Sequence, residues 1–163
     1  MNAPRPAPEI VQVQTEEQLQ QVRVLFREYH SELPREIRTV CFDQEVEGLP
    51  GKYAPPGGTL LLATLDGQPA GCVGLRPFPQ IDRACEMKRL YVRPTFRSEK
   101  LGSLLVREII HEARLRGYLR LRLDTHLPTM QAAVGLYRRF HFVEVSDVAA
   151  AIPELTYMEL KLE

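Results

Sequence analysis

The sequence has few cysteines and no recognisable metal-binding pattern. Its three cysteines, Cys41, Cys72 and Cys85, are odd in number and form no CxxC pair. This argues against a disulfide framework and against a cysteine zinc site, so we interpret them as reduced, buried thiols. HExxH and HxxxH patterns are also missing, and the sequence therefore predicts no bound metal.

Long apolar runs and an excess of one charge are missing as well. No apolar run is long enough to span a bilayer, and the N-terminal segment MNAPRPAPE has no hydrophobic signal core. The 21 Lys and Arg residues are balanced by 21 Asp and Glu residues, which argues against a surface built for nucleic acid. We expect a cytoplasmic protein that binds neither membrane nor nucleic acid.

The length and composition indicate one globular domain. The 163 residues are 44% hydrophobic and 26% charged, enough to bury a core without metal or disulfide support. Residues 1–8 contain three prolines and are predicted to be a flexible lead-in. Residues 9–163 form the predicted domain.

Hydrophobic periodicity predicts the element order β-α-α-β-β-β-α-β-α-β-β. Thr15 and Gln18 have the spacing of a capping box before the first helix, and Pro34 closes that helix. Residues 48–58 are rich in glycine and proline and are expected to lack regular structure. The other helices are predicted at 43–47, 101–116 and 128–140, and the strands at 9–13, 59–65, 69–77, 83–92, 118–125, 142–145 and 155–162. This order predicts an α+β fold with a mixed, mostly antiparallel central sheet flanked by helices on both faces.

The stretch VRPTFRSEKLGSLLVREII joins a strand to a helix through a short polar loop. The first turn of a helix has free backbone N–H groups and partial positive charge, which favour a bound anion. Gly102 allows close approach to the main chain, and Arg97 and Lys100 can screen the anion. Residues 83–122 contain 11 Lys or Arg residues against four Glu residues, a net charge of +7. A multiply phosphorylated small ligand suits that field, although a solvated, basic amphipathic helix would show the same spacing. GxGxxG and GxxxxGK[ST] motifs are absent, so dinucleotide and P-loop sites have no support.

Three segments together resemble the GNAT superfamily of acetyl-CoA-dependent N-acetyltransferases: CEMKRLYV, VRPTFRSEKLGSLLVREIIHEA and LRLDTHLPTMQAAVGLYRRFHFVEV. The resemblance covers about residues 59–145. In that family the loop before the helix cradles the pyrophosphate of coenzyme A, and the preceding strand pairs with the pantetheine arm. The resemblance implies that the coenzyme site is formed by Leu90, Tyr91, Val92, Arg97, Ser98, Glu99, Lys100, Leu101, Gly102, Ser103, Met130 and Ala133.

The loop departs from the family at two positions. The family usually has glycine where this sequence has Ser98 and Lys100, and we expect Lys100 to require a φ below zero. Either Lys100 has gained a phosphate contact or coenzyme binding is weakened or lost. Met130 also stands where the family often has Asn, and His141 where it usually has Gly. These departures leave two further readings: a non-catalytic acyl-CoA-binding module, and a scaffold that has lost the ligand.

The resemblance also implies two catalytic residues. Glu86 stands where the family often places the carboxylate that deprotonates the amine through water, and Tyr137 matches the tyrosine that protonates the leaving sulfur. The alternatives are that Glu86 faces solvent or pairs with Lys88 or Arg89, and that Tyr137 is a core tyrosine. The expected reaction is direct transfer of an acetyl group from acetyl-CoA to a primary amine of a small molecule or peptide, in a ternary complex.

The acceptor itself is not indicated by any motif. Its expected walls are the first two helices, the 48–58 loop and the segment 146–154. Tyr53 in the loop is a candidate lid residue or a surface aromatic, and His126 is a candidate for substrate contact. Dimers are common in the family, which leaves a homodimer open.

Overall fold

The computed structural model describes residues 6–148 and 154–163, and the strands in these residues form one sheet. The sheet has the order β1-β2-β3-β4-β5-β7-β6. Its strands are β1 (Glu9–Gln12), β2 (Thr59–Leu65), β3 (Gln68–Pro77), β4 (Ala84–Val92), β5 (Arg120–Thr125), β6 (Val143–Val145) and β7 (Thr156–Lys161). All neighbouring strands pair antiparallel except β4 and β5, which pair parallel. The predicted fold class is confirmed.

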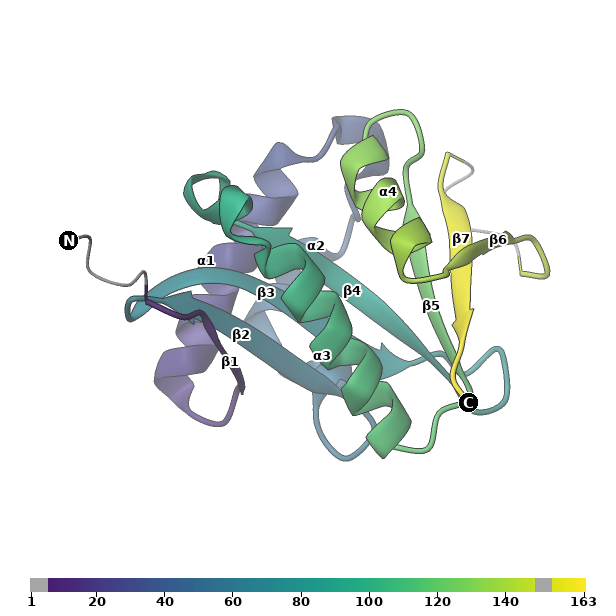
Figure 1. The fold of residues 1–163 in the computed structure, drawn as a ribbon, viewed down its shortest axis with the longest axis horizontal. Coiled ribbons are helices and arrows are strands. Elements are labelled where there is room, and N and C mark those ends of the chain that lie inside the picture. Colours follow the sequence, from purple (N-terminus) through teal and green to yellow (C-terminus); the bar gives the residue numbers. More distant parts are fainter. Residues whose placement is uncertain (1–5, 149–153) are drawn as a thin grey trace.

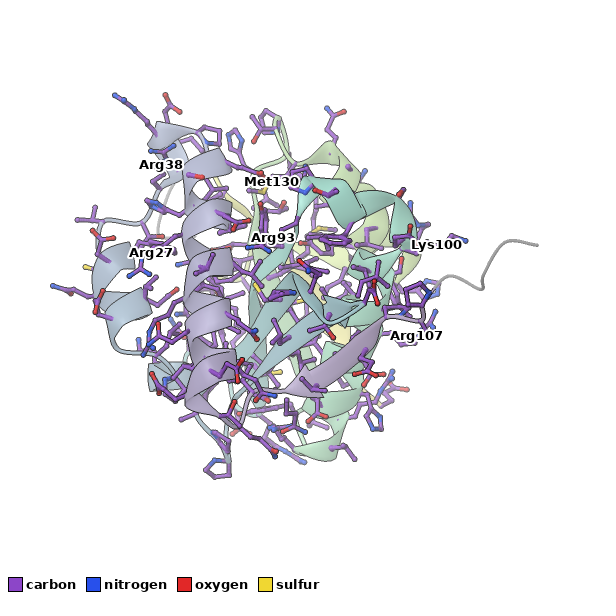
Figure 2. The ribbon with its side chains drawn as sticks, turned by 90° about the vertical axis from the view of Figure 1, so that its left-hand side faces the viewer. Arg27, Arg38, Arg93, Lys100, Arg107 and Met130 are labelled. Carbon is purple, nitrogen blue, oxygen red and sulfur yellow. The ribbon has the colours of Figure 1, made fainter. Side chains whose placement is uncertain are left out.

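Helices cover both faces of the sheet (Figure 1). They are α1 (Glu16–Glu32), α2 (Phe42–Glu47), α3 (Leu101–Leu115) and α4 (Gln131–Arg139), with short 3-10 helices η1 (Arg35–Ile37), η2 (Gly51–Tyr53) and η3 (Pro94–Glu99). In Figure 2, Arg27 and Arg38 lie on the side of α1 and α2, and Lys100 and Arg107 lie on the opposite side. The predicted order of helices and strands is confirmed, and most boundaries shift by one to three residues.

Two hydrophobic cores lie on opposite faces of the sheet. Strand β2 contributes to both, because its side chains alternate between the faces. Leu61 and Ala63 pack in the core beneath α3 and α4, whereas Leu60 and Leu62 pack in the core beneath α1 and α2. This double burial explains why the sequence of β2 is almost wholly apolar.

The start of α1 follows the sequence prediction. The backbone N–H of Gln18 donates to the Thr15 hydroxyl (3.2 Å), and the Thr15 N–H donates to the Gln18 side chain (3.1 Å). This reciprocal capping box satisfies two backbone donors at the helix N-terminus. The helix ends at Glu32, two residues before Pro34.

Several local expectations were wrong. Tyr53 is neither a lid nor a surface residue, because its side chain is buried against the sheet. The 48–58 segment contains η2, so it is not wholly irregular. Cys41 is exposed, whereas Cys72 and Cys85 are buried as expected, and all three are free thiols. The segment 146–154 lies partly outside the described residues.

Tyr53 fills space that Gly74 leaves open, and this contact predicts a stability effect. A Cβ atom on Gly74 would lie 2.6 Å from the Tyr53 ring. Gly74→Ala should therefore lower the free energy of unfolding by about 1–3 kcal/mol, because the ring has to shift within a packed core. Urea denaturation measures the change. Gly135→Ala in α4, where the nearest atom is 3.8 Å away, is the control and should not destabilise; equal effects of the two substitutions would contradict the packing account.

No described helix is long and apolar enough to cross a membrane. Within residues 6–148 and 154–163, His, Cys, Asp and Glu side chains form no group of three or more that is arranged to hold a metal ion.

Candidate active site

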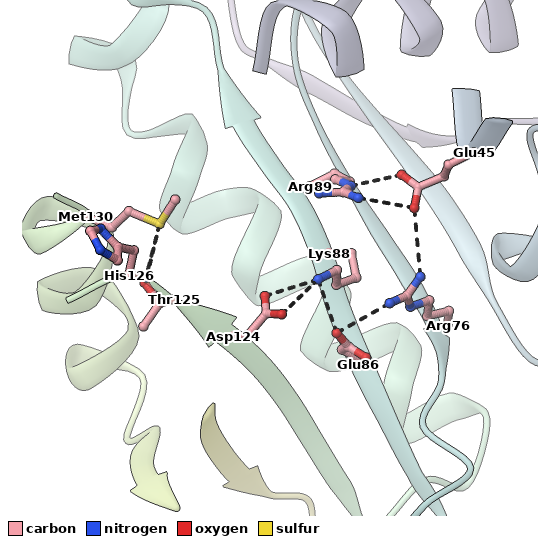
Figure 3. Close-up of polar contacts among 9 residues, drawn as sticks. All are labelled: Glu45, Arg76, Glu86, Lys88, Arg89, Asp124, Thr125, His126 and Met130. Carbon is pink, nitrogen blue, oxygen red and sulfur yellow. Dashed lines mark hydrogen bonds and ion pairs between the residues drawn. The ribbon is translucent and has the colours of Figure 1, made fainter. Parts of the chain in front are cut away.

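The sheet opens between its two parallel strands. Strands β4 and β5 pair only at Ala84–Arg120, Cys85–Leu121 and Glu86–Arg122, although β4 continues to Val92 and β5 to Thr125. Beyond Glu86 the two strands separate, as Figure 3 shows. The facing edges therefore carry backbone groups that are not used in a β4–β5 ladder, and such an edge can pair with an extended ligand.

A β-bulge in β4 lies next to this opening. Lys88 pairs with Gly74 and Tyr91 with Cys72, so β4 has one more residue than β3 in this interval. Arg89 takes up the extra residue with a left-handed φ of 60°. A bulge turns consecutive side chains toward the same face and bends the strand. Lys88 and Arg89 accordingly both reach acidic partners on the face covered by α1 and α2 (Figure 3).

The opening holds a cavity of about 550 Å³ between α1, β4, β5 and α4. Eight of the residues predicted for the site line it: Leu90, Tyr91, Val92, Arg97, Gly102, Met130, Ala133 and Tyr137. The structure thus brings the β4 edge, the α3 N-terminus and α4 to one cavity, although these segments lie up to 47 residues apart in the sequence.

The remaining predicted residues do not line this cavity. They are Glu86, Ser98, Glu99, Lys100, Leu101 and Ser103. Leu101 is a core residue with no exposed surface, and Ser98 and Lys100 are exposed to solvent. The role predicted for residues 97–103 belongs to their main chain, so it stays a prediction.

Lys100 corrects one expectation directly. Its φ is 59° and its ψ is 24°, the left-handed conformation, whereas we expected a φ below zero. The residue is the C-cap of η3 and the N-cap of α3. The loop therefore keeps a backbone shape that suits glycine, at an energetic cost that a lysine has to bear.

This conformation predicts that Lys100→Gly stabilises the fold. Removal of the side chain relieves the left-handed penalty, and we expect the free energy of unfolding to rise by about 1 kcal/mol. Arg107→Gly is the matched control, because Arg107 is exposed in the right-handed interior of α3 and glycine there costs about 1 kcal/mol. Urea denaturation of both variants should show shifts of opposite sign. A loss of stability in Lys100→Gly would mean that the lysine side chain makes a stabilising contact.

Tyr137 lies at the α4 side of the cavity. Its side chain is 8% exposed and packs against the Phe142 ring at 5.9 Å, so it belongs to the core and to the cavity wall at once. Burial raises the pKa of the phenol above its ordinary value, and the charge of Asp124 adds to this shift. The phenol therefore stays protonated at neutral pH, as a proton donor must.

Glu86 lies on the face of the sheet that α1 and α2 cover. It occupies the last position at which β4 and β5 pair with each other. The residue is 5% exposed, and its carboxylate lies 3.3 Å from Lys88 Nζ and 3.6 Å from an Arg76 guanidinium nitrogen. The alternative that Glu86 pairs with Lys88 is confirmed. Its predicted role as a base stays a prediction, and any proton has to reach it through another group or water.

Glu86 is one member of a charged ladder that crosses this face of the sheet (Figure 3). The ladder runs through Asp124, Lys88, Glu86, Arg76, Glu45 and Arg89. Sequence reasoning missed Asp124, Arg76 and Glu45, because their contacts depend on the sheet order and on the placement of α2. One signal available in the sequence was that Asp124 is the acidic residue that ends the apolar strand motif LRLD.

Arg97 connects the loop before α3 to the end of α1. Its guanidinium donates to the Val92 carbonyl (2.9 Å) and pairs with Glu32 (2.9 Å). The same carboxylate group of Glu32 accepts from the Tyr91 hydroxyl at 3.2 Å. Because the Arg97–Glu32 pair is solvent-exposed, opening it for an anionic ligand is inexpensive.

His126 lies at the end of β5 but does not line the cavity. Its Nδ1 lies 2.6 Å from the Thr129 hydroxyl, and Thr129 does line the cavity. Contact between His126 and a substrate stays a prediction.

The sheet, the opening between β4 and β5 and the cavity beside α4 together form a site that can hold an extended ligand between two splayed strands. The sequence profile of the Acetyltransferase (GNAT) family matches residues 19–142, a range that includes every residue lining the cavity. The chain therefore belongs to the GNAT family of acetyltransferases.

Similar proteins agree with this assignment. The chain is 39% identical over 152 residues to an uncharacterized N-acetyltransferase of Schizosaccharomyces pombe, with 92% of each chain covered. It is 29% identical to an uncharacterized N-acetyltransferase of Dictyostelium discoideum, with 93% of this chain and 98% of the other covered. Among solved structures, a putative acetyltransferase of Salmonella typhimurium with its cofactor acetyl-CoA has a TM-score of 0.74 at 20% identity, covering 96% of this chain and 95% of the other.

Proposed function

We propose that this protein transfers the acetyl group of acetyl-CoA to a primary amine of a small molecule or peptide, by direct attack in a ternary complex. The observation that carries the proposal is the cavity at the β4–β5 opening, with free strand edge on one side and a buried phenol on the other. The similar Salmonella typhimurium protein is described with acetyl-CoA as its cofactor.

The residues around the opening fit acetyl-CoA. The edge of Leu90, Tyr91 and Val92 suits the pantetheine arm, whose amides pair with backbone groups as an added strand does. The left-handed Lys100 keeps the loop in a glycine-like shape, so the main chain from Arg97 to Ser103 is proposed to cradle the diphosphate. The basic charge of residues 83–122 attracts that anion from a distance.

Tyr137 is proposed to protonate the sulfur as coenzyme A leaves. The amine nitrogen forms a bond to the acetyl carbon, the carbon–sulfur bond breaks, and the phenol proton goes to the sulfur. The sequence predicts Glu86 as the base that receives the proton of the amine. We also propose that the protein is located in the cytoplasm, where acetyl-CoA is present.

A non-catalytic acyl-CoA-binding module is the alternative. It was motivated by the missing loop glycines, but Lys100 adopts the conformation that a glycine would supply. The protonated Tyr137 at the cavity also gives the site a group that binding alone does not need. Both observations favour the enzyme.

Two measurements test the proposal. Release of free thiol from acetyl-CoA is measured with a panel of primary amines, and the melting temperature is measured with and without coenzyme A. We expect amine-dependent thiol release and a higher melting temperature, because a ligand that binds only the native state stabilises it. Stabilisation without turnover would favour the binding module. The absence of both effects would favour a scaffold that binds no ligand.

A further inference from the structure

Asp124 is the carboxylate of the charged ladder that faces the cavity. It lines the cavity together with Tyr137 and Lys88, whereas Glu86 does not. The Asp124 side chain is 23% exposed and the Glu86 side chain 6% exposed. A ligand that enters the opening therefore meets Asp124 before it can reach Glu86.

The position of Asp124 is set by the splay of the sheet. Asp124 and Lys88 each lie two residues beyond Arg122 and Glu86, the last residues at which β4 and β5 pair with each other. Both carboxylate oxygens of Asp124 accept from Lys88 Nζ at 3.1 Å, which makes this the first side-chain bridge across the gap (Figure 3). The residue thus lies at the point where an extended ligand between the strands has to end.

Asp124 can exchange its partner without leaving a buried charge unpaired. Lys88 has a second carboxylate, Glu86, at 3.3 Å, and it keeps this partner if Asp124 turns toward a ligand. Glu86 in turn keeps Arg76 at 3.6 Å. Unpaired buried charges are costly, so the ladder makes Asp124 the member that can be released most cheaply.

We infer that Asp124 is the residue that binds the acceptor amine and takes its proton; the inference rests on the proposed acetyl transfer. The Asp124 carboxylate takes one proton of the bound ammonium, which frees the nitrogen lone pair, and later passes this proton to solvent. The neutral amine then attacks the thioester carbon, the carbon–nitrogen bond forms, and the second proton that leaves the nitrogen replaces the one that Tyr137 gives to the sulfur. The carbon–sulfur bond breaks, and Tyr137 supplies the proton of the thiol. Asp124 thus takes the role that the sequence predicts for Glu86, which does not line the cavity. Lys88 and Glu86 become positioning residues that hold Asp124 at the opening and balance its charge.

The test compares two nucleophiles in the full-length protein. The variants are Asp124→Asn, Glu86→Gln and, as a control for the loss of a distant surface carboxylate, Glu47→Gln. n-Propylamine is largely protonated at neutral pH and needs a carboxylate base that removes its proton, whereas hydroxylamine is largely uncharged there and does not. We expect Asp124→Asn to lower kcat/KM for propylamine by about 10²-fold or more and for hydroxylamine by less than about tenfold. Glu86→Gln should have a smaller effect on propylamine than Asp124→Asn, and Glu47→Gln should have none.

A rescue experiment separates chemistry from structure. Formate should raise the turnover of Asp124→Ala by at least about tenfold, because it replaces the missing carboxylate. The melting temperature and its rise with acetyl-CoA should match the wild type in Asp124→Asn.

The outcomes are distinguishable. Near-wild-type turnover of Asp124→Asn, or an equal loss for both nucleophiles without formate rescue, would overturn the role of Asp124 and leave the proposed function intact. A wild-type protein that releases no thiol with either nucleophile or with any amine of the panel would overturn both.

Discussion

Tyr137→Phe is expected to lower kcat by about 10²-fold or more while acetyl-CoA affinity stays within about twofold. The substitution removes only the phenol oxygen, so the ring still fills its place beside Phe142. The thiolate then leaves without a proton donor, and this raises the barrier of the chemical step. Steady-state kinetics of thiol release measure kcat, and calorimetric titration measures the affinity.

Tyr118→Phe is the matched control for this experiment. Tyr118 is a second partly buried tyrosine, and its hydroxyl donates to the Gly57 carbonyl at 2.6 Å, outside the cavity. Its loss should affect stability but not kcat. A wild-type rate in Tyr137→Phe, or an equal loss of rate in both variants, would remove Tyr137 from the mechanism.

Arg89→Met is expected to destabilise the fold by about 3 kcal/mol, at the low end of the range for breaking a buried ion pair. The Arg89 side chain is 5% exposed and donates to both carboxylate oxygens of Glu45 at 2.9 and 3.2 Å. Burial opposes its charge, but the hydrogen bonds and charge of Glu45 outweigh burial and raise the pKa of Arg89. The guanidinium also lies over the rings of Tyr29 and Phe42, so it ties α1 and α2 to the bulge.

The double variant Arg89→Met, Glu45→Gln completes a double-mutant cycle. Because Glu45 is left without its main partner in the single variant, removal of its charge should recover a large part of the loss. Chemical denaturation of the wild type, both single variants and the double variant gives the coupling energy. Additive effects of the two substitutions would contradict the ion-pair account.

Much of the fold could be predicted from local patterns. The capping box at Thr15 and the apolar spacing of α1 and α3 are encoded within a few residues. The strand–loop–helix segment around Gly102 is equally local, and the resemblance at Tyr137 placed α4 at the site. These features depend on neighbours in the sequence, so the sequence is enough to find them.

The features that sequence reasoning missed depend on contacts between distant residues. Tyr53 is buried because Gly74, 21 residues later, leaves room for its ring. The Lys88–Asp124 bridge requires the parallel pairing of β4 with β5, and the Arg89–Glu45 pair requires the bulge at Arg89. Lys100 adopts a backbone conformation that is uncommon for its residue type, and only the structure reveals it.

The central claim is that the main chain from Arg97 to Ser103 cradles the diphosphate of coenzyme A. A crystal structure of the protein with acetyl-CoA tests it most directly. The account predicts diphosphate oxygens within hydrogen-bond distance of backbone N–H groups in this segment, with the pantetheine arm along Leu90 to Val92. Coenzyme bound elsewhere, or a loop that stays empty at saturating acetyl-CoA, would contradict it.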